Sequence, residues 1–152
     1  MTRINLIDPV DLTDNHLIAE YREIRLLTSH LVRSLQSSRG VVKSTLPNQF
    51  TLNSGHVRFF YDKGKYLHHR YDSLKKEMIA RGFSPENEFE REKWPDRLYG
   101  DWTPTERDKN IVRERIILRI NQKPHLYRYQ GKYIQGLDFV KNKYQAFLEV
   151  KK

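Results

Sequence analysis

The sequence predicts an all-α fold, with a single compact domain of about three main helices joined by long loops. Three segments combine helical start and stop signals with long runs free of breakers, and few segments alternate as a strand does. The length of 152 residues suits one domain, and no repeat or low-complexity stretch marks a linker. We expect residues 1–133 to form the main domain and residues 134–152 a C-terminal extension, a short helix packed on it.

The first half of the chain predicts an arm, a helix and a loop. Residues 1–12 contain Pro9 and predict an extended arm. Thr13 or Asp14 caps the helix that follows, which runs to about residues 35–38 before Gly40 stops it. Its apolar residues recur at helical spacing: Leu17, Tyr21, Ile24, Leu31 and Leu35. Residues 41–55 contain Pro, Asn, Ser and Gly and predict a loop.

The second half predicts two further helices. One runs from about Asp62 to Arg81, and a long acidic connection over residues 83–102 follows, which we expect to pack through its aromatic residues. The clearest start signal is the run Thr-Pro-Thr-Glu at residues 103–106, which places a cap at Thr103, a Pro at the first helical position and a Glu three residues after the cap. This third helix ends before Lys123-Pro124.

Composition excludes several classes of protein. The chain has no Cys, which excludes disulfides and thiolate metal sites. No apolar run approaches the roughly 20 residues of a membrane span. A signal peptide has a basic start followed by an apolar run, and Asp8, Asp11 and Asp14 interrupt such a pattern here. No glycine-rich phosphate loop or metal-binding His motif is present. We therefore expect a protein without metal or cofactor, in the cytoplasm or associated with the nucleoid.

The positive charge is concentrated in two segments. The chain has a net charge of +9, but residues 1–40 hold five Arg against five acids. Residues 56–82 hold seven Lys and Arg against three acids, and residues 113–133 hold six against one. This distribution predicts a surface that binds a polyanion, most simply nucleic acid. The alternative is a small basic protein that binds no DNA.

The amino terminus is the first candidate for chemistry. The small side chain of Thr2 permits removal of Met1, which leaves a free α-amine on Thr2. An α-amine has a pKa of about 7.7–8.0, against about 10.4 for Lys, and the like charges of Arg3 and Arg22 favour its neutral form. A neutral amine is a nucleophile suited to imine chemistry at a sugar carbon. The alternative is an ordinary amino terminus.

The first predicted helix carries carboxylates beside a basic face. On a helical wheel, His16, Glu20 and Glu23 lie on one flank of the apolar stripe. The adjoining face is made by Arg22, Leu26, Ser29 and Arg33. DNA phosphates repel a carboxylate, so one at this place is a candidate for proton abstraction or for stabilising a cationic intermediate. The alternative is a solvated helix with weak Glu–Arg pairs.

Residues 113–133 combine basic and aromatic side chains. Arg115 and Arg119 lie one helical turn apart and suit adjacent phosphates. The residues after the helix alternate between aromatic and basic: Tyr127, Arg128, Tyr129, Lys132 and Tyr133. This pattern is typical of an element that stacks on bases and holds phosphates. The alternative is a set of core aromatic residues whose basic neighbours extend past them to solvent.

Short motifs spread along the chain resemble one known family. They are residues 1–6, residues 16–17 and 19–23, residues 55–57 and 59–63, Arg81-Gly82-Phe83, Gly100-Asp101 and residues 104–106. In order and spacing they are similar to the pyrimidine-dimer DNA glycosylase/AP lyase family of the phage endonuclease V type. The likeness runs from Met1 to about Lys132, and it has no evident gap over the first 83 residues.

The resemblance implies a fold and a mechanism. The family has a single all-α domain whose first helix carries the active-site Glu, with the N-terminal arm packed against it. In such enzymes the α-amine of the residue after Met attacks the deoxyribose carbon under the damaged base, the base leaves and an imine remains. The Glu stabilises this intermediate and supports the β-elimination that nicks the strand. By motif match these roles fall on Thr2 and Glu23.

The resemblance also implies a partner and its contacts. We expect a monomer that acts on double-stranded DNA containing lesions, namely UV-induced cyclobutane pyrimidine dimers, with no cofactor and no membrane. The family kinks the duplex and flips out a base opposite the lesion, which costs a few kcal/mol and less at damaged DNA. The expected DNA-binding residues are Arg3, His16, Arg22, Arg25, Arg33, Arg115, Arg119, Tyr127, Arg128, Tyr129 and Lys132.

Departures from the family pattern keep two alternatives open. Leu26 stands where the family usually has an Arg one turn after Arg22, and Arg25 lies about 100° away on the wheel. Leu126 and Gln130 stand where the family has aromatic residues. The same imine chemistry on another damaged or modified base is one alternative. A non-catalytic DNA-binding protein is the other, and the carboxylate of Glu23 speaks against it.

Overall fold

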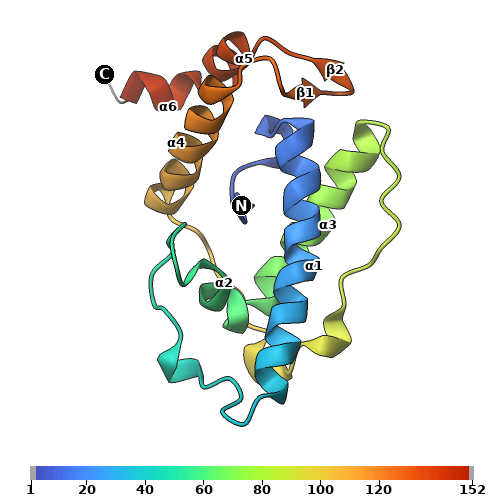
Figure 1. Ribbon diagram of the computed structural model, residues 1–152, viewed down its shortest axis with the longest axis vertical. Coiled ribbons are helices and arrows are strands. Elements are labelled where there is room, and N and C mark those ends of the chain that lie inside the picture. Colours follow the sequence, from blue (N-terminus) through green and yellow to red (C-terminus); the bar gives the residue numbers. More distant parts are fainter. Residues whose placement is uncertain (1–2, 151–152) are drawn as a thin grey trace.

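The computed structural model describes residues 3–150 and confirms the all-α class (Figure 1). Its long helices are α1 (Asp14–Gln36), α3 (Gly64–Ala80) and α4 (Glu106–Gln122). The short helices within the described part are α2 (His56–Phe59), α5 (Gly136–Lys143) and α6 (Gln145–Val150). The expected number of about three therefore fits the long helices and misses the short ones.

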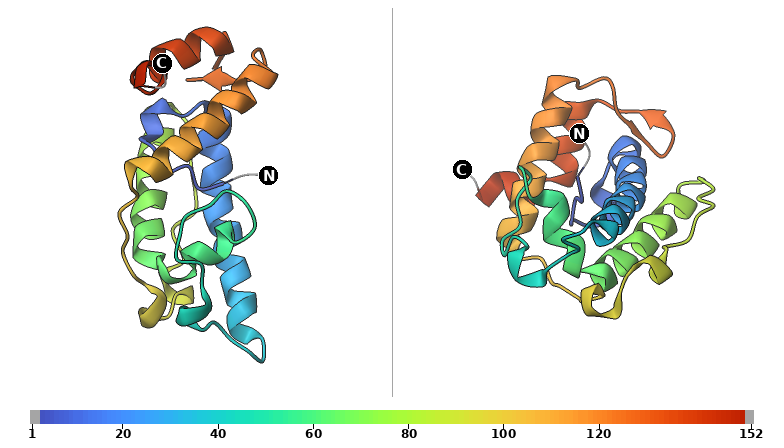
Figure 2. Two further views of the ribbon diagram at one scale, coloured as in Figure 1. Left: turned by 90° about the vertical axis from the view of Figure 1, so that its left-hand side faces the viewer. Right: turned by 60° about the horizontal axis from the view of Figure 1, so that its bottom comes forward.

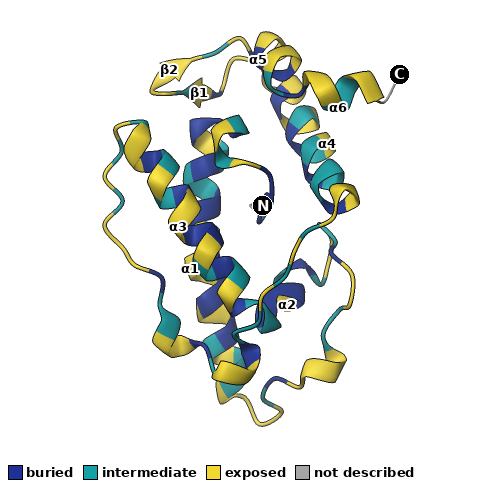
Figure 3. Cartoon of the chain, turned by 180° about the vertical axis from the view of Figure 1, so that it is seen from behind, coloured by how far each residue is buried: buried dark blue, intermediate teal, exposed yellow. Residues whose placement is uncertain are grey.

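Helix α1 is the element on which the others are arranged. It begins after Thr13, whose Oγ1 accepts a hydrogen bond from the backbone N–H of His16 (3.1 Å), so of the two predicted caps Thr13 is the cap and Asp14 is the first helical residue. Its apolar stripe packs against α3, and Leu17, Ile24 and Leu31 are fully buried. In Figure 1 and in the right-hand view of Figure 2, α4 lies on one side of α1 and α3 on the other. In Figure 3 the buried residues of α1 and α3 face each other and the exposed residues of α3 face outward.

Helix α3 begins two residues later than the sequence predicts. A 3-10 turn over Phe60–Asp62 includes the expected first residue, and α3 itself starts at Gly64. A Cβ at Gly64 would lie 2.7 Å from Cε3 of Trp94, so only glycine permits this close packing. Trp94 and Phe89 are buried here, which confirms that the acidic connection packs through its aromatic residues.

Helix α4 also begins two residues later than predicted, at Glu106 instead of Pro104. The cap is Thr105, not Thr103. Thr105 Oγ1 accepts from the N–H of Asp108 (3.2 Å), and Asp108 Oδ2 accepts from the N–H of Thr105 (3.0 Å). This reciprocal pair satisfies two backbone donors at once. A cap at Thr103 with Glu106 as its partner was therefore the wrong choice between two overlapping start signals.

A small hairpin, absent from the predictions, follows α4. It pairs β1 (Arg128–Tyr129) with β2 (Lys132–Tyr133) through a turn at Gln130 and Gly131, both with positive φ. The buried carboxylate of Asp14 accepts from the backbone N–H groups of Gln130 (2.9 Å) and Gly131 (2.7 Å). The first residue of α1 thus fixes the hairpin, and strands of two residues are too short for a sequence pattern to reveal.

The C-terminal residues fold back on this end of the molecule. Helix α5 packs on α4, and Tyr144 Oη donates to the backbone oxygen of Asp11 (2.7 Å). Phe139 is buried with its ring 5.5 Å from that of Tyr129 in the hairpin. Within residues 3–150, no helix is both long and apolar enough to cross a bilayer.

Candidate active site

The N-terminal arm runs into the middle of the molecule, between α1 and α4 (Figure 1). Ile4 and Ile7 are buried, and the backbone N–H of Ile4 donates to Nε2 of His56 (3.1 Å). The backbone oxygen of Ile7 accepts from Nη1 of Arg70 (2.6 Å). Thr2, the predicted nucleophile, lies outside the described residues, so the described arm begins at Arg3.

Glu23 is half-buried on α1, near enough to the arm for the charge of Arg3 to act on its carboxyl group. Burial raises the pKa of its carboxyl group, and the positive charges of Arg3 and His30 oppose that rise. The carboxyl therefore accepts a proton more readily than an exposed glutamate. A carboxyl group in this state suits both general acid–base work and the stabilisation of a nearby cation.

Glu20 was predicted on the same flank as Glu23, but the structure gives it a different role. Its side chain is completely buried, and both carboxylate oxygens accept from Arg70, at 2.6 Å from Nε and 2.9 Å from Nη2. Breaking such a buried pair typically costs about 3–5 kcal/mol. Glu20 is therefore part of the framework, and of these two predicted carboxylates only Glu23 stays a candidate for chemistry.

A pocket of about 150 Å³ lies beside the arm, and most of its lining was predicted to bind DNA. The lining residues are Arg3, Asn5, His16, Ala19, Arg115, Arg119 and Tyr127. Burial and the neighbouring charges of Arg119 and Arg3 lower the pKa of Arg115. The fold thus brings three guanidinium groups to one pocket, and no carboxylate lines it. A pocket with this charge suits the binding of a phosphate group.

His16 and Tyr127 form one wall of this pocket. Their rings stack with centroids 5.1 Å apart and 7° between the planes, and His16 Nδ1 lies 2.7 Å from Thr13 Oγ1. Burial lowers the pKa of His16 to about 4, with Arg115 and Arg119 adding to the effect, so the ring is neutral at pH 7. Tyr127 is buried, and one face of its ring is covered by His16 rather than open to a base.

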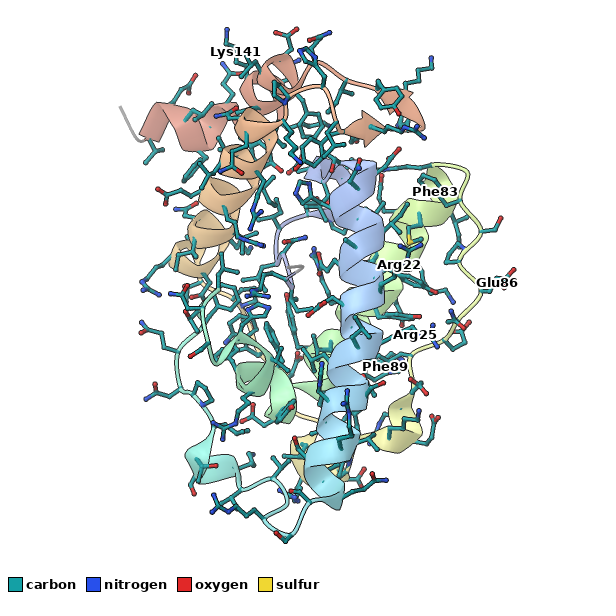
Figure 4. The ribbon with its side chains drawn as sticks, viewed as in Figure 1. Arg22, Arg25, Phe83, Glu86, Phe89 and Lys141 are labelled. Atoms are coloured by element: carbon teal, nitrogen blue, oxygen red, sulfur yellow. The ribbon has the colours of Figure 1, made fainter. Side chains whose placement is uncertain are left out.

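The other predicted DNA contacts lie outside this pocket. Arg22 and Arg128 line a second hollow of about 500 Å³, on the far side of Ala19. Figure 4 shows Arg22 and Arg25 projecting from α1 toward the segment that carries Phe83, Glu86 and Phe89. Arg33 is exposed near the end of α1, and Lys132 is exposed on β2.

Tyr129 is held within the fold. Its hydroxyl donates to the backbone oxygen of Val10 (2.7 Å), and the guanidinium carbon of Arg81 lies 4.2 Å from its ring centroid. For Tyr127 and Tyr129, the structure therefore matches the alternative in which these aromatic residues pack inside the molecule. Tyr133, on β2, is exposed and carries the cation of Arg128 over its ring.

Part of the positive charge of segment 56–82 is used inside the fold, so its net charge overstates the surface that it offers to DNA. Arg70 and Arg81 are buried in ion pairs with Glu20 and with Asp14. Lys63 and Lys75 are paired with Asp62 and Glu88. Most of the segment lies in α3, on the opposite side of α1 from α4 (Figure 2). Much of this positive charge holds the fold together.

A basic surface that the sequence analysis missed joins Arg58 of this segment to residues of the loop before it. The chain has no Asp or Glu between Glu23 and Asp62. Arg39, Lys43 and Arg58 in this interval are exposed. Figure 2 shows the connection from α1 to α2 on the same side of the molecule as the end of α1. The sequence signal for this surface is the long interval without acidic residues, not a high density of basic residues.

Buried histidines should make the fold sensitive to acid. Burial lowers the pKa of His56 to about 4, below the 6.5 of a free histidine. Between these pH values the unfolded chain binds a proton at His56 that the folded chain does not, so stability is full above pH 6.5 and falls as the pH drops toward 4. We expect a loss of about 3 kcal/mol from this group.

Urea unfolding between pH 4 and pH 7 measures this effect. His56→Gln should show a shallower pH dependence than the wild type, whereas substitution of the exposed His125 by Gln should not change it. Equal slopes for the wild type and His56→Gln would contradict the burial of a neutral His56.

A family comparison covers the arm, α1, α2 and α3. The model of the family described as pyrimidine dimer DNA glycosylase matches residues 1–91, which is more than half of the chain. The match includes the arm, Glu23 and His56, and it ends before α4 and the hairpin. This family consists of DNA repair enzymes, and DNA is the substrate that its name gives. The chain belongs to the pyrimidine dimer DNA glycosylase family.

Proposed function

We propose that this enzyme is a bifunctional glycosylase and AP lyase that acts on cyclobutane pyrimidine dimers in double-stranded DNA. The α-amine of Thr2, freed by removal of Met1, attacks C1′ of the damaged nucleotide. The bond from C1′ to the base breaks as the base leaves. A proton then passes from the nitrogen to O4′ as the C1′–O4′ bond breaks, which opens the sugar ring and gives a protonated imine. Abstraction of a proton from C2′ then expels the 3′ phosphate by β-elimination, which nicks the strand.

The observation that carries this proposal is the half-buried Glu23 near the arm. Its carboxylate can stabilise the cationic imine, and its raised pKa suits it to take up and return a proton during elimination. The guanidinium groups of Arg3, Arg115 and Arg119 line the adjacent pocket, where they can hold the phosphates of the attacked strand. A protein that only bound DNA would gain nothing from a carboxylate in this position.

A second candidate is the same chemistry on another damaged base. Leu26 and Leu126 are about half-exposed, so neither side chain is committed to the core, and the family's usual residues are absent from both positions. A panel of duplexes with a dimer, an abasic site or an oxidised base distinguishes the candidates. Cleavage of the dimer and the abasic duplex supports our proposal. Cleavage of the abasic and oxidised-base duplexes without the dimer would instead support the second candidate.

The DNA-binding surface should extend from the pocket to the loop before α2. Arg119 is exposed at the pocket, and Lys43 is exposed in the acid-free interval. If each neutralises one phosphate, replacing either by Ala should lower the slope of log K against log salt by about one unit and weaken binding on all sequences alike. Fluorescence anisotropy over a salt series measures both quantities.

Lys76→Ala is the matched control for these variants. Lys76 is exposed on α3, which lies on the side of α1 away from α4, so its loss should leave the slope unchanged. A Lys43→Ala slope equal to that of the wild type would remove the loop from the DNA-binding surface. An unchanged slope for Arg119→Ala would remove α4 as well.

A further inference from the structure

We propose that His56 and Arg70 form a clamp that positions the N-terminal arm for attack, so that both are positioning residues for the reaction. This inference rests on the proposed function, because it assigns a purpose to the path of the arm toward the reacting amine. Neither residue lines the pocket described above, where we expect the substrate to bind. Both act on the backbone of residues 4–7.

The first half of the clamp is a hydrogen bond with a fixed direction. His56 Nδ1 lies 2.8 Å from the backbone oxygen of Thr51, which can only accept, so the ring proton resides on Nδ1. Nε2 is then an acceptor, and the backbone N–H of Ile4 donates to it at 3.1 Å. His56 is 2% exposed and its ring is wedged between Phe50 and Phe60, so its acceptor has little freedom to move.

The second half of the clamp holds the other end of the arm. Arg70 donates through Nη1 to the backbone oxygen of Ile7, while its Nε and Nη2 donate to the two carboxylate oxygens of Glu20 on α1. One guanidinium thereby joins the arm, α1 and α3. Between the two anchors the backbone bends at Leu6, which has φ of 61°, a conformation that residues other than glycine rarely adopt. Without the two anchors, the backbone at Leu6 would relax to a more favourable conformation.

The clamp determines where the amino terminus can reach. Covalent geometry keeps a residue two positions before Ile4 within about 7 Å of that anchor. Arg3 adds a third contact, from its Nε to the backbone oxygen of Leu52 (2.8 Å), in the same loop that carries Thr51. Because a displacement of about 1 Å at a reacting group can slow a reaction about a hundredfold, loss of the clamp should act on rate more than on DNA affinity.

Two substitutions at His56 separate positioning from packing. The amide of Gln can place an acceptor near the position of Nε2, whereas the shorter Asn can replace only Nδ1. We expect His56→Asn to lower the single-turnover rate of borohydride-trapped adduct formation on an abasic duplex by roughly ten- to a hundredfold. His56→Gln should stay within about threefold of the wild type. Affinity for a duplex with an uncleavable tetrahydrofuran site should change less than twofold in both.

Arg70→Lys tests the other anchor and His68→Asn is the control. Lysine keeps a positive charge for Glu20 but cannot reach Glu20 and Ile7 together, so the trapping rate should fall while DNA affinity is retained. The ring of His68 stacks on Phe89 and forms a hydrogen bond with Tyr99. Neither of these contacts involves the arm. His68→Asn therefore measures how far the rate falls when a packed histidine is lost and only stability changes.

The outcomes distinguish the clamp from the proposed function. Folded His56→Asn and Arg70→Lys that trap DNA at the wild-type rate would overturn the clamp. A wild-type enzyme that forms no adduct would overturn the proposed function instead. If the variants fold poorly, hydrogen exchange on the wild type decides the matter. The Ile4 amide should exchange as slowly as core amides, and exchange at the rate of an exposed loop amide would overturn the clamp.

Discussion

Replacing Glu23 by Gln should abolish most strand cleavage and leave binding to damaged DNA intact. General acid–base groups typically contribute 10²–10⁴-fold to a rate, and we expect a loss in this range. Gln keeps the size of the side chain but can neither take up a proton nor offer a negative charge to the cationic imine. Because it also removes a charge that repels phosphate, affinity should stay the same or rise.

Single-turnover cleavage of a dimer-containing duplex measures the first effect, and anisotropy with an uncleavable abasic analogue measures the second. Glu86→Gln is a suitable control, because Glu86 is an exposed carboxylate on the far side of α1 (Figure 4). Its rate should match the wild type. If Glu23→Gln cleaves DNA as fast as Glu86→Gln, Glu23 has no part in the chemistry.

Blocking the α-amine should have an effect at least as large. An enzyme that retains Met1, or that is acetylated at its amino terminus, lacks the proposed nucleophile in its proper place. A lysine is a poor substitute, because with pKa values near 7.8 and 10.4 roughly a tenth of α-amines but fewer than a thousandth of lysines are neutral at pH 7. We therefore expect lyase activity to fall to the level of uncatalysed strand breakage.

Thr2→Ser is the matched control for the blocked enzyme. Serine also permits removal of Met1 and leaves a free α-amine, so activity should persist. Mass spectrometry of the intact chain establishes which amino terminus each preparation carries, and gel analysis of an abasic duplex gives the rate. Full activity in the acetylated enzyme would falsify a mechanism through the α-amine.

The long helices could be predicted because their signals are local. The apolar stripe of α1, its Thr13 cap and the stop before Pro124 each act within a few residues, and the structure confirms all three. The start of α4 could not be fixed, because Thr103 and Thr105 both offer a cap and only the reciprocal bonds with Asp108 select Thr105. The hairpin depends on Asp14, more than a hundred residues away, so no local pattern announces it.

The candidate site was predictable to the extent that motifs marked it. The resemblance pointed to Glu23 and to the basic residues, and the fold brings Arg3, His16, Arg115 and Arg119 to one pocket. Charge alone could not distinguish Glu20 from Glu23 on the same flank, because the difference is the partner Arg70, fifty residues away. For the same reason, the bases of residues 56–82 looked like a DNA surface, although Arg70 and Arg81 are buried in ion pairs.

The most direct test of the mechanism is the site of the covalent bond. Sodium borohydride added during reaction with a dimer-containing duplex should reduce the imine to a stable amine and trap enzyme on DNA. Digestion and mass spectrometry of the adduct should place the deoxyribose remnant on the α-amine of Thr2. An adduct on a lysine side chain, or cleavage of the duplex with no trapped adduct, would contradict the account.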